Sequence, residues 1–276
     1  MLIDTHVHVG GGVLGYDMEE DMVLTAMQRY GIDYALVSNC DAVEVDHDQK
    51  LIPGEQQISQ EECLKRVLAL ARKHPGKIGV GAWVKPLTET LTEELETLIK
   101  DNLDIVRAIK LHPYHSKISP MDEKVRPFLE LAKKYRLPVI SHTGGCEEAE
   151  PVHLYEAALA YPEIPFVMVH MGLGSDNKAA LELLGKADNL YGDTTWVRMA
   201  TTEEAIARYG SKKMMFGSDM PIDGVDTYLC NPWGERSVYQ DYLHVLPEKI
   251  AKETYEDLMW KNAVKVFGLK QFCEMV

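Results

Sequence analysis

Residues 166–170 read Phe166-Val167-Met168-Val169-His170, four apolar side chains followed by a histidine. A short run that is apolar at every position is typical of a strand buried on both faces, as in a parallel sheet covered by helices. Amphipathic stretches with helical spacing lie on either side of this run, at 153–161 and 177–186. The run therefore belongs to a strand–helix pattern, which continues toward both ends of the chain.

The same alternation predicts eight strands, each followed by a helix. The strands are expected at 2–8, 33–38, 78–84, 107–112, 138–142, 166–170, 190–194 and 214–218. The helices are expected at 19–30, 59–74, 92–101, 123–135, 153–161, 177–186, 203–209 and 255–267. Two helices begin with favourable capping residues: Ser59 with Glu62 forms a capping box, and Thr202 precedes Glu203.

Eight such units without a break in composition predict one α/β domain over residues 1–276, a (β/α)8 or TIM barrel. The alternative is an open, doubly wound parallel sheet. Two long loops are expected, at 39–58 after the second strand and at 220–247 after the eighth. Both would lie on the C-terminal face of the barrel, where active sites of this fold are built. Loops of this length are typical of lids or binding loops.

The composition limits the partners that we expect. The formal net charge is −14, from 43 acidic and 29 basic residues. This balance argues against nucleic acid and anionic membranes as partners and leaves small molecules. The five cysteines are scattered without a Cys-x-x-Cys pair, which favours a reducing compartment. Since neither a secretion signal nor a run of about 18 apolar residues is found, we expect a cytoplasmic protein.

Histidines and an aspartate recur at the ends of the predicted strands. His6 and His8 point to the same face of the first strand, with Cα atoms about 6.5 Å apart. His142, His170 and Asp219 end the fifth, sixth and eighth strands. In a parallel barrel all these ends meet at one mouth, so their side chains can converge. Imidazoles with a carboxylate suit zinc or another first-row divalent metal, whereas incidental strand histidines are the alternative.

This pattern resembles the amidohydrolase superfamily of metal-dependent TIM-barrel hydrolases, in particular the branch that includes aminocarboxymuconate semialdehyde decarboxylase. The resemblance runs from Asp4-Thr5-His6-Val7-His8 to Asn262-Ala263-Val264-Lys265-Val266-Phe267-Gly268. It implies one divalent metal ion, with zinc first and manganese or iron as alternatives, and the ligands His6, His8, His142 and Asp219. It also implies that Asp219 and His170 are catalytic, with His170 orienting or activating water. A second metal near Lys110 stays open, and a homodimer is compatible with the family.

The resemblance and the ligand chemistry together predict a hydrolase. A bound divalent metal lowers the pKa of water toward 7, and the site could attack an ester, lactone or amide of a small, carboxylated metabolite. A non-oxidative decarboxylase with the same ligands is the first alternative, and a non-catalytic metal-binding barrel is the second. Gly10-Gly11-Gly12 follows the histidine pair, where decarboxylases of this branch often carry a proline, so the sequence favours hydrolysis.

Three cations are candidates for holding a substrate carboxylate: Lys110 and His112 at the end of the fourth strand, and Arg198 after the seventh. For Lys110 the alternative is a buried pair with an acid such as Asp4. Asp4 itself is expected either to orient a metal ligand or to be a paired acid inside the barrel. Other side chains at strand ends are expected to form the cavity wall: Trp83, Lys85, Tyr114, His115 and Trp196.

Two further features are interpreted as unrelated to cofactor binding. The stretch from Gly10 to Gly15 matches G-x-G-x-x-G, but acidic residues crowd the next helix start and would repel a pyrophosphate. These glycines are expected instead to leave space beside the metal for substrate. His47 lies in an acidic stretch, from Asp41 to Asp48, and is expected to be part of a solvated loop, with closure of this loop over the site as the alternative.

Overall fold

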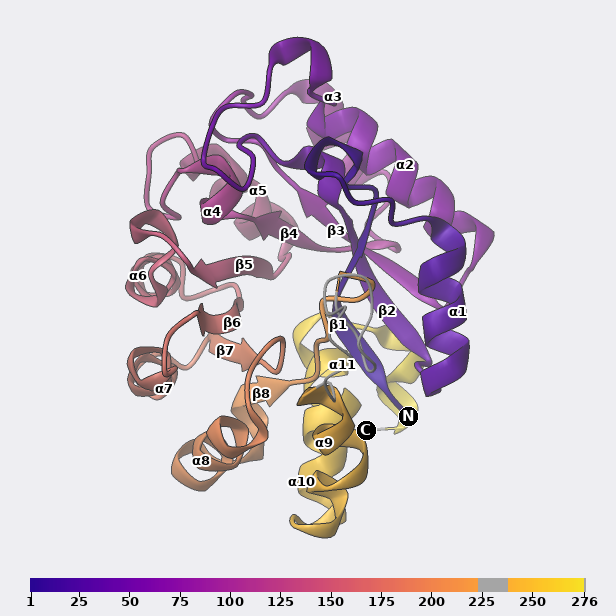
Figure 1. Cartoon of the computed structure of the whole chain (residues 1–276), viewed down its shortest axis with the longest axis vertical. Coiled ribbons are helices and arrows are strands. Elements are labelled where there is room, and N and C mark those ends of the chain that lie inside the picture. Colours follow the sequence, from indigo (N-terminus) through magenta and orange to yellow (C-terminus); the bar gives the residue numbers. More distant parts are fainter. Residues whose placement is uncertain (223–237, 276) are drawn as a thin grey trace.

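Eight parallel strands form one sheet in the order in which they follow along the chain, from β1 to β8. The computed structural model describes residues 1–222 and 238–275. The strands are β1 (Ile3–Val9), β2 (Tyr34–Asn39), β3 (Ile78–Trp83), β4 (Val106–Leu111), β5 (Val139–Gly144), β6 (Phe166–Leu173), β7 (Leu190–Asp193) and β8 (Met214–Met215). In Figure 1 the sheet curls around a central axis, with helices on its outer side.

The segment after β8 joins the sheet to β1. Thr5 N donates to Phe216 O at 3.0 Å, Asp219 N donates to His6 O at 2.8 Å and His8 N donates to Met220 O at 2.9 Å. These bonds alternate between the two segments, as in a parallel ladder. Both edges of the sheet are thereby connected, so the TIM-barrel prediction is confirmed and the open doubly wound sheet is wrong.

Helices of the described residues connect successive strands and cover them. They are α1 (Glu20–Tyr30), α2 (Gln60–Lys73), α3 (Glu93–Lys100), α4 (Pro113–Ser116), α5 (Arg126–Tyr135), α6 (Pro151–Ala160), α7 (Lys178–Leu184), α8 (Met199–Tyr209), α9 (Val238–His244), α10 (Lys252–Glu256) and α11 (Asn262–Val266). The π-helix Asp257–Lys261 joins α10 to α11. None of these helices has the length and hydrophobicity that crossing a bilayer requires.

Element boundaries mostly differ from the sequence expectation by one to three residues, and the larger differences have local causes. Ser59 caps α2 as expected, with its side chain accepting from Glu62 N at 3.2 Å. The helix predicted at 203–209 begins earlier, at Met199, so Thr202 is not its cap. Thr202 is buried inside α8, where its hydroxyl lies 2.6 Å from Tyr242 Oη of α9. Tertiary packing overrides the local capping signal at this position.

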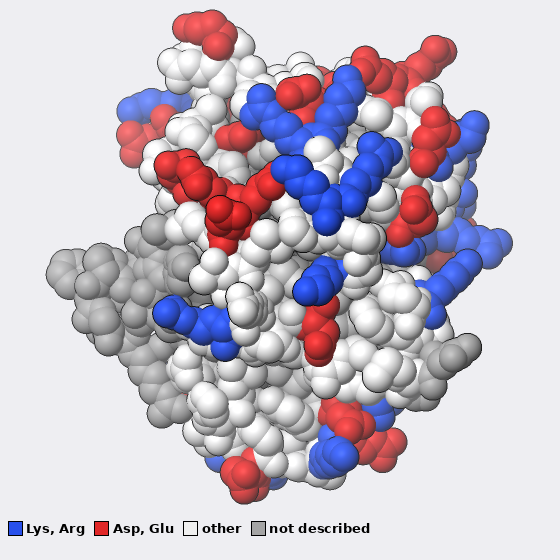
Figure 2. All heavy atoms as spheres, turned by 90° about the vertical axis from the view of Figure 1, so that its right-hand side faces the viewer, with Lys and Arg blue, Asp and Glu red and all other residues white. Residues whose placement is uncertain are grey.

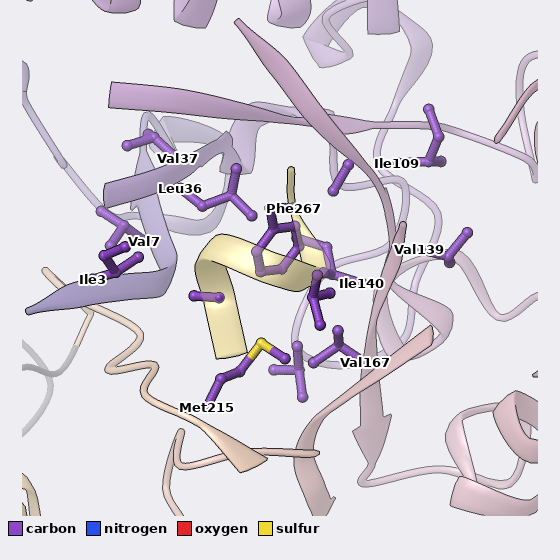
Figure 3. Close-up of a cluster of buried hydrophobic side chains, with 14 of the residues drawn as sticks. Ile3, Val7, Leu36, Val37, Ile109, Val139, Ile140, Val167, Met215 and Phe267 are labelled. Atoms are coloured by element: carbon purple, nitrogen blue, oxygen red, sulfur yellow. The ribbon is translucent and has the colours of Figure 1, made fainter. Parts of the chain in front are cut away.

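The core continues into the barrel and is closed by the end of α11. Figure 3 shows Phe267 among Leu36, Ile140 and Met215, side chains from three different strands. All four side chains are almost fully buried. The C-terminal helix thus contributes a large aromatic ring to the interior, which leaves the opposite end of the barrel for a site.

The outer surface over α1 and α2 carries charges of both signs. Figure 2 shows Lys and Arg next to Asp and Glu on this face. Ion pairs connect neighbouring helices here: Lys73 Nζ lies 2.8 Å from Glu20 Oε2, and Lys65 Nζ lies 2.6 Å from Glu94 Oε1. These exposed pairs contribute little to stability each, at most about 1 kcal/mol.

Two long loops follow β2 and β8, as expected from the sequence. The loop at 39–58 contains the short helices Cys40–Ala42 and Gly54–Gln56 and packs over the mouth of the barrel. Of the loop at 220–247, residues 223–237 lie outside the described residues, and α9 follows them.

Candidate metal centre

Three side chains converge at the C-terminal mouth of the barrel. His6 Nε2 and His8 Nε2 are 2.8 Å apart, and Asp219 Oδ1 lies 3.0 Å from His8 Nε2 and 3.5 Å from His6 Nε2. All three residues are buried and form a candidate metal-binding group. Ligand atoms around a tetrahedral ion bound at 2.0–2.1 Å are separated by about 3.3 Å. The observed separations are close to this value, so the geometry fits a divalent metal.

The protonation states of His6 and His142 are compatible with metal binding. Among the described residues, the buried Nδ1 atoms of His6, His8 and His142 have no hydrogen-bond partner. Burial, together with neighbouring cations, holds the pKa of His6 well below its usual range, and burial is also the main cause of the lowered pKa of His142. Both imidazoles are therefore neutral, which is the form that binds metals.

His142 lines the same cavity but is not part of the convergent group. Its ring centroid is 4.6 Å from that of His170, and its Nε2 lies 3.1 Å from Gly144 O. A backbone carbonyl only accepts, so this bond places the ring proton on Nε2. Three of the four ligands that the resemblance implies thus lie together, and His142 as a ligand stays a prediction.

Asp219 presents one oxygen to the histidines and the other to a neighbouring loop. Its Oδ2 accepts from Trp196 Nε1 at 3.0 Å, while Oδ1 faces His6 and His8. Burial opposes ionisation of Asp219, but the hydrogen bond to His8 and nearby imidazoles outweigh it and hold the pKa of this carboxyl below its usual value. The carboxylate is therefore charged and available to a cation.

His170 is fixed from both its backbone and its ring. It has a positive φ of 68°, and its N–H donates to Asp193 Oδ1 at 3.0 Å. Its Nδ1 lies 3.3 Å from Thr195 O, which places the proton on Nδ1 and leaves Nε2 as an acceptor. Burial lowers the pKa of His170 to about 4. A neutral imidazole that can accept a proton thus lines the cavity beside the ligands.

Asp193 is the main functional candidate that the sequence interpretation missed. It ends β7, is fully buried, and accepts from the backbone N–H and hydroxyl of Thr195 as well as from His170. Its Oδ2 also lies 3.7 Å from His6 Nδ1. Burial raises the pKa of Asp193 to about 7. An acid at the end of the seventh strand was the available signal, because the candidate ligands His6, His8 and Asp219 also lie at strand ends.

Asp4 and Lys110 lie beneath the candidate ligands and, within the described part of the chain, form no ion pair with each other. Asp4 accepts from Ser218 Oγ at 2.5 Å, from Ser218 N at 3.0 Å and from His6 N at 3.1 Å. It thereby ties the end of β1 to the segment after β8. Burial raises the pKa of this carboxyl to about 7. Asp4 thus orients the backbone of a ligand.

Lys110 has no exposed surface, and its Nζ lies 3.1 Å from His6 Nε2. Burial lowers the pKa of this ammonium group to about 8. Lys110 therefore borders the candidate ligands from below rather than lining the cavity wall, and its role in holding a substrate carboxylate stays a prediction.

A cavity of about 540 Å³ opens above the candidate ligands. His112 forms part of its wall, with its ring stacked between Trp83 at 4.8 Å and His142 at 4.3 Å. Burial holds the pKa of His112 well below its usual range, so this side chain is a neutral donor or acceptor rather than a cation. The rest of the described lining is largely aromatic and aliphatic and includes Leu14, Tyr16, Tyr114, Leu173, Trp196 and Ile222.

Arg198 is not brought to this cavity. Its side chain is exposed at the start of α8, and it is absent from the described lining. Lys85 is also outside the lining: it is fully buried, and its Nζ contacts Glu89 Oε1 at 3.0 Å and Ile58 O at 2.7 Å. A substrate contact by Arg198 therefore has no support among the described residues.

His47 is exposed, as expected of a solvated loop, and it also lines the cavity, which agrees with the alternative that this loop closes over the site. The loop that carries it is attached to α4. Val45 O lies 2.7 Å from His115 Nδ1, the N–H of Val45 donates to His115 O at 2.9 Å, and Tyr114 Oη donates to His47 O at 3.3 Å. These contacts between two distant loops could not be inferred from local sequence.

The glycines after β1 are not among the described residues that line the cavity, although Leu14 of the same segment is. Gly11 N and Gly12 N donate to Asp41 Oδ1 at 2.8 and 3.1 Å, so a carboxylate of this chain occupies the amides that a phosphate would need. A Cβ at Gly10 would lie 2.5 Å from Asn39 Oδ1, and φ there is +79°. Gly10 therefore makes room for the second-strand loop, and the expected space for substrate at these glycines is not supported among the described residues.

Buried imidazoles and a carboxylate at the mouth of a TIM barrel are the class of site found in metal-dependent enzymes of this fold. A family model described as Amidohydrolase matches residues 3–269. The chain therefore belongs to the amidohydrolase family and is an enzyme of that superfamily, which confirms the resemblance. None of the curated proteins matches it in sequence.

Solved structures with similar folds belong to proteins that are named for different reactions. A 2,6-dihydroxybenzoate decarboxylase from Rhizobium has a TM-score of 0.68 and 15% identity, covering 98% of this chain and 99% of its own. A 4-oxalomesaconate hydratase from Rhodopseudomonas palustris has a TM-score of 0.64 and 17% identity, covering 98% and 97%. A protein from Acinetobacter baumannii assigned as a 2-pyrone-4,6-dicarboxylic acid hydrolase has a TM-score of 0.64 and 13% identity, covering 97% and 99%. At these identities the likeness concerns the fold.

Proposed function

We propose that this chain is a metal-dependent hydrolase that cleaves a C–O or C–N bond of a small molecule bound in the 540 Å³ cavity. The observation that carries the proposal is the convergence of His6 Nε2, His8 Nε2 and Asp219 Oδ1 at the floor of that cavity. The proposed metal is one divalent ion, zinc first, and His142 is proposed as a further ligand. The substrates that fit are lactones, esters or amides.

A divalent ion held by these residues would polarise a carbonyl group and acidify water. The residues of the chain then divide the proton chemistry. His170 Nε2 can accept a proton or a hydrogen bond, because its Nδ1 proton is committed to Thr195 O. Asp219 is proposed to accept a proton from water as well as to bind the metal, because the lowered pKa of its carboxyl keeps it ionised. His112 is proposed to contact a polar group of the substrate from the wall.

Non-oxidative decarboxylation is the second candidate, with the same ligands. It is supported by the stack of Trp83, His112 and His142, which forms a flat wall suited to an unsaturated or aromatic acid. The fold likeness to a 2,6-dihydroxybenzoate decarboxylase agrees with such a substrate.

The test is a comparison of products. The zinc-loaded protein is incubated with a panel of lactones, esters and amides and with a panel of unsaturated carboxylic acids, reading acid release against carbon dioxide release. We expect acid release from the first panel, and carbon dioxide release alone would replace hydrolysis by decarboxylation. Asp219→Asn and His170→Asn serve as controls. If both variants kept every activity of the unaltered chain, the site would not be catalytic, and a metal-dependent binding protein would remain.

A further inference from the structure

Trp196 occupies an unusual place at the mouth of the cavity. It lies in the loop between β7 and α8, has a positive φ of 58° and is 36% exposed. A bulky residue in the left-handed region is strained, and such a conformation persists only where its surroundings fix it. Two hydrogen bonds do so here, one from the backbone and one from the indole ring.

The indole bond reaches a candidate metal ligand. Trp196 Nε1 donates to Asp219 Oδ2 at 3.0 Å. An indole N–H only donates, so it can hold a carboxylate oxygen but cannot itself bind a cation. With Oδ2 occupied in this way, Oδ1 is the oxygen that lies 3.0 Å from His8 Nε2. The two oxygens of Asp219 are thus distinguished by Trp196.

The backbone bond anchors Trp196 to a different part of the fold. Trp196 N donates to Tyr239 Oη at 2.8 Å, and Tyr239 belongs to α9. The Tyr239 side chain is fully buried, with its ring 6.1 Å from that of Phe216. Phe216 O in turn accepts from Thr5 N of β1. The backbone of Trp196 is therefore anchored to the core.

We propose that Trp196 is a positioning residue that selects Oδ1 of Asp219 as the single oxygen presented to the metal. This inference rests on the proposed role of Asp219 as a metal ligand. Without the indole N–H, the carboxylate can turn about its Cβ–Cγ bond and offer either oxygen or both. The exposed ring also forms cavity wall, so a role in shape alone is the alternative that the experiment must separate.

The decisive variant is Trp196→Phe in the full chain, which keeps an aromatic wall and removes the N–H. The affinity for Zn²⁺ is measured by competition with a chromogenic chelator, and the coordination is followed by the visible absorption spectrum of Co²⁺ bound in its place. Loss of a hydrogen-bond partner of a metal ligand typically costs ten- to a hundredfold in affinity. We expect Trp196→Phe to bind Zn²⁺ about tenfold more weakly, with a shifted Co²⁺ spectrum.

A matched control is Trp260→Phe, which makes the same replacement in the buried π-helix. It should leave the Zn²⁺ affinity and the Co²⁺ spectrum unchanged. Tyr239→Phe is a second variant that keeps the indole but removes the oxygen that anchors its backbone. It should give an intermediate loss, so the inference stays testable if Trp196→Phe fails to fold.

The outcomes separate this inference from the proposed function. Equal Zn²⁺ affinity and identical Co²⁺ spectra for Trp196→Phe and the unaltered chain would overturn the positioning role and leave the hydrolase proposal standing. Trp196→Phe could also fold, lose as much stability as Trp260→Phe and bind Zn²⁺ as tightly as the unaltered chain. The indole ring would then only form part of the cavity wall, and the positioning role would be overturned. If Trp196→Phe weakens metal binding while the unaltered chain hydrolyses none of the tested panel, the positioning role holds and the hydrolase proposal fails.

Discussion

A buried carboxyl group of the 39–58 loop should make the stability of this protein fall as the pH rises. Glu44 is 1% exposed, and its Oε1 accepts from Thr88 N at 2.6 Å and from Thr88 Oγ1 at 2.8 Å. Its Oε2 is buried without a hydrogen-bond partner among the described residues. Burial raises the pKa of Glu44 from 4.5 to about 7, against the opposing effect of these bonds and of Lys85.

The sign and size of the effect follow from this shift. A carboxyl whose pKa is raised on folding holds its proton more tightly in the folded chain than in the unfolded one. Its stabilisation is therefore complete below about pH 4.5 and is lost as the pH rises through about 7. A shift of this size corresponds to about 3 kcal/mol of unfolding free energy, with a slope of at most about 1.4 kcal/mol per pH unit.

Glu44→Gln isolates this contribution, because glutamine keeps an oxygen for Thr88 and cannot ionise. Urea unfolding of both proteins is measured at pH 5, 6, 7 and 8.5. At pH 5 the variant should be more stable than the unaltered chain by no more than about 1 kcal/mol, and by pH 8.5 it should be more stable by up to about 3 kcal/mol. Parallel curves, with a constant difference at all four values, would refute the assignment of a buried, proton-holding Glu44.

Further predictions concern the site and the core. Replacing His170 by asparagine should lower kcat about a hundred- to ten-thousandfold, the range for a general acid or base, while Zn²⁺ affinity changes little; an unchanged kcat argues against its proposed role. Removing metal with a chelator should lower Tm, and Zn²⁺ at about a hundred times its Kd should restore about 2.7 kcal/mol; equal Tm values with and without Zn²⁺ would exclude a metal site in the folded chain. Phe267→Ala should cost about 3–5 kcal/mol in urea unfolding, because the ring fills the barrel interior. Leu51→Ala, at a position 58% exposed, should change stability by less than about 0.5 kcal/mol, and a similar loss in both variants would contradict this view of the core.

The positions of the site residues could be predicted because one geometric rule applies to all of them. In a parallel barrel every strand ends at the same mouth, so a polar residue at the end of an apolar run is directed to the site. This rule located His6, His8 and Asp219, which converge. It also located His142 and His170, which line the same cavity. The barrel itself followed from the alternation of buried runs and amphipathic stretches.

What could not be predicted depends on contacts between distant segments. The depth of Lys110 beneath His6 and the exposure of Arg198 are set by packing. In the sequence both are simply cations near the end of a strand, Lys110 within β4 and Arg198 after β7. The closeness of His47 to the cavity depends on bonds between the second-strand loop and α4. Trp196 adopts a positive φ, which local propensity does not indicate for a tryptophan.

The contacts around the candidate ligands divide the mouth of the barrel into two parts. In the part of the mouth formed by the ends of β6, β7, β8 and β1, hydrogen bonds connect neighbouring segments. Asp193 accepts from His170, Asp219 accepts from Trp196, and Asp4 accepts from Ser218. His170, Asp219 and Trp196 all have positive φ, and each such residue costs of the order of 1–3 kcal/mol unless its surroundings compensate.

The opposite part of the mouth, formed after β2, β3 and β4, is built from stacked rings and from loop contacts through backbone atoms. Stacked rings tolerate replacement by other rings, whereas a buried carboxylate with three donors does not. Substitutions after β2 to β4 should therefore alter which molecule fits in the cavity, and substitutions after β6 to β8 should alter metal binding and proton transfer. Metal binding and substrate fit should then depend on separate groups of residues, so that substitutions on one side of the mouth can change the substrate while the candidate metal ligands stay in place.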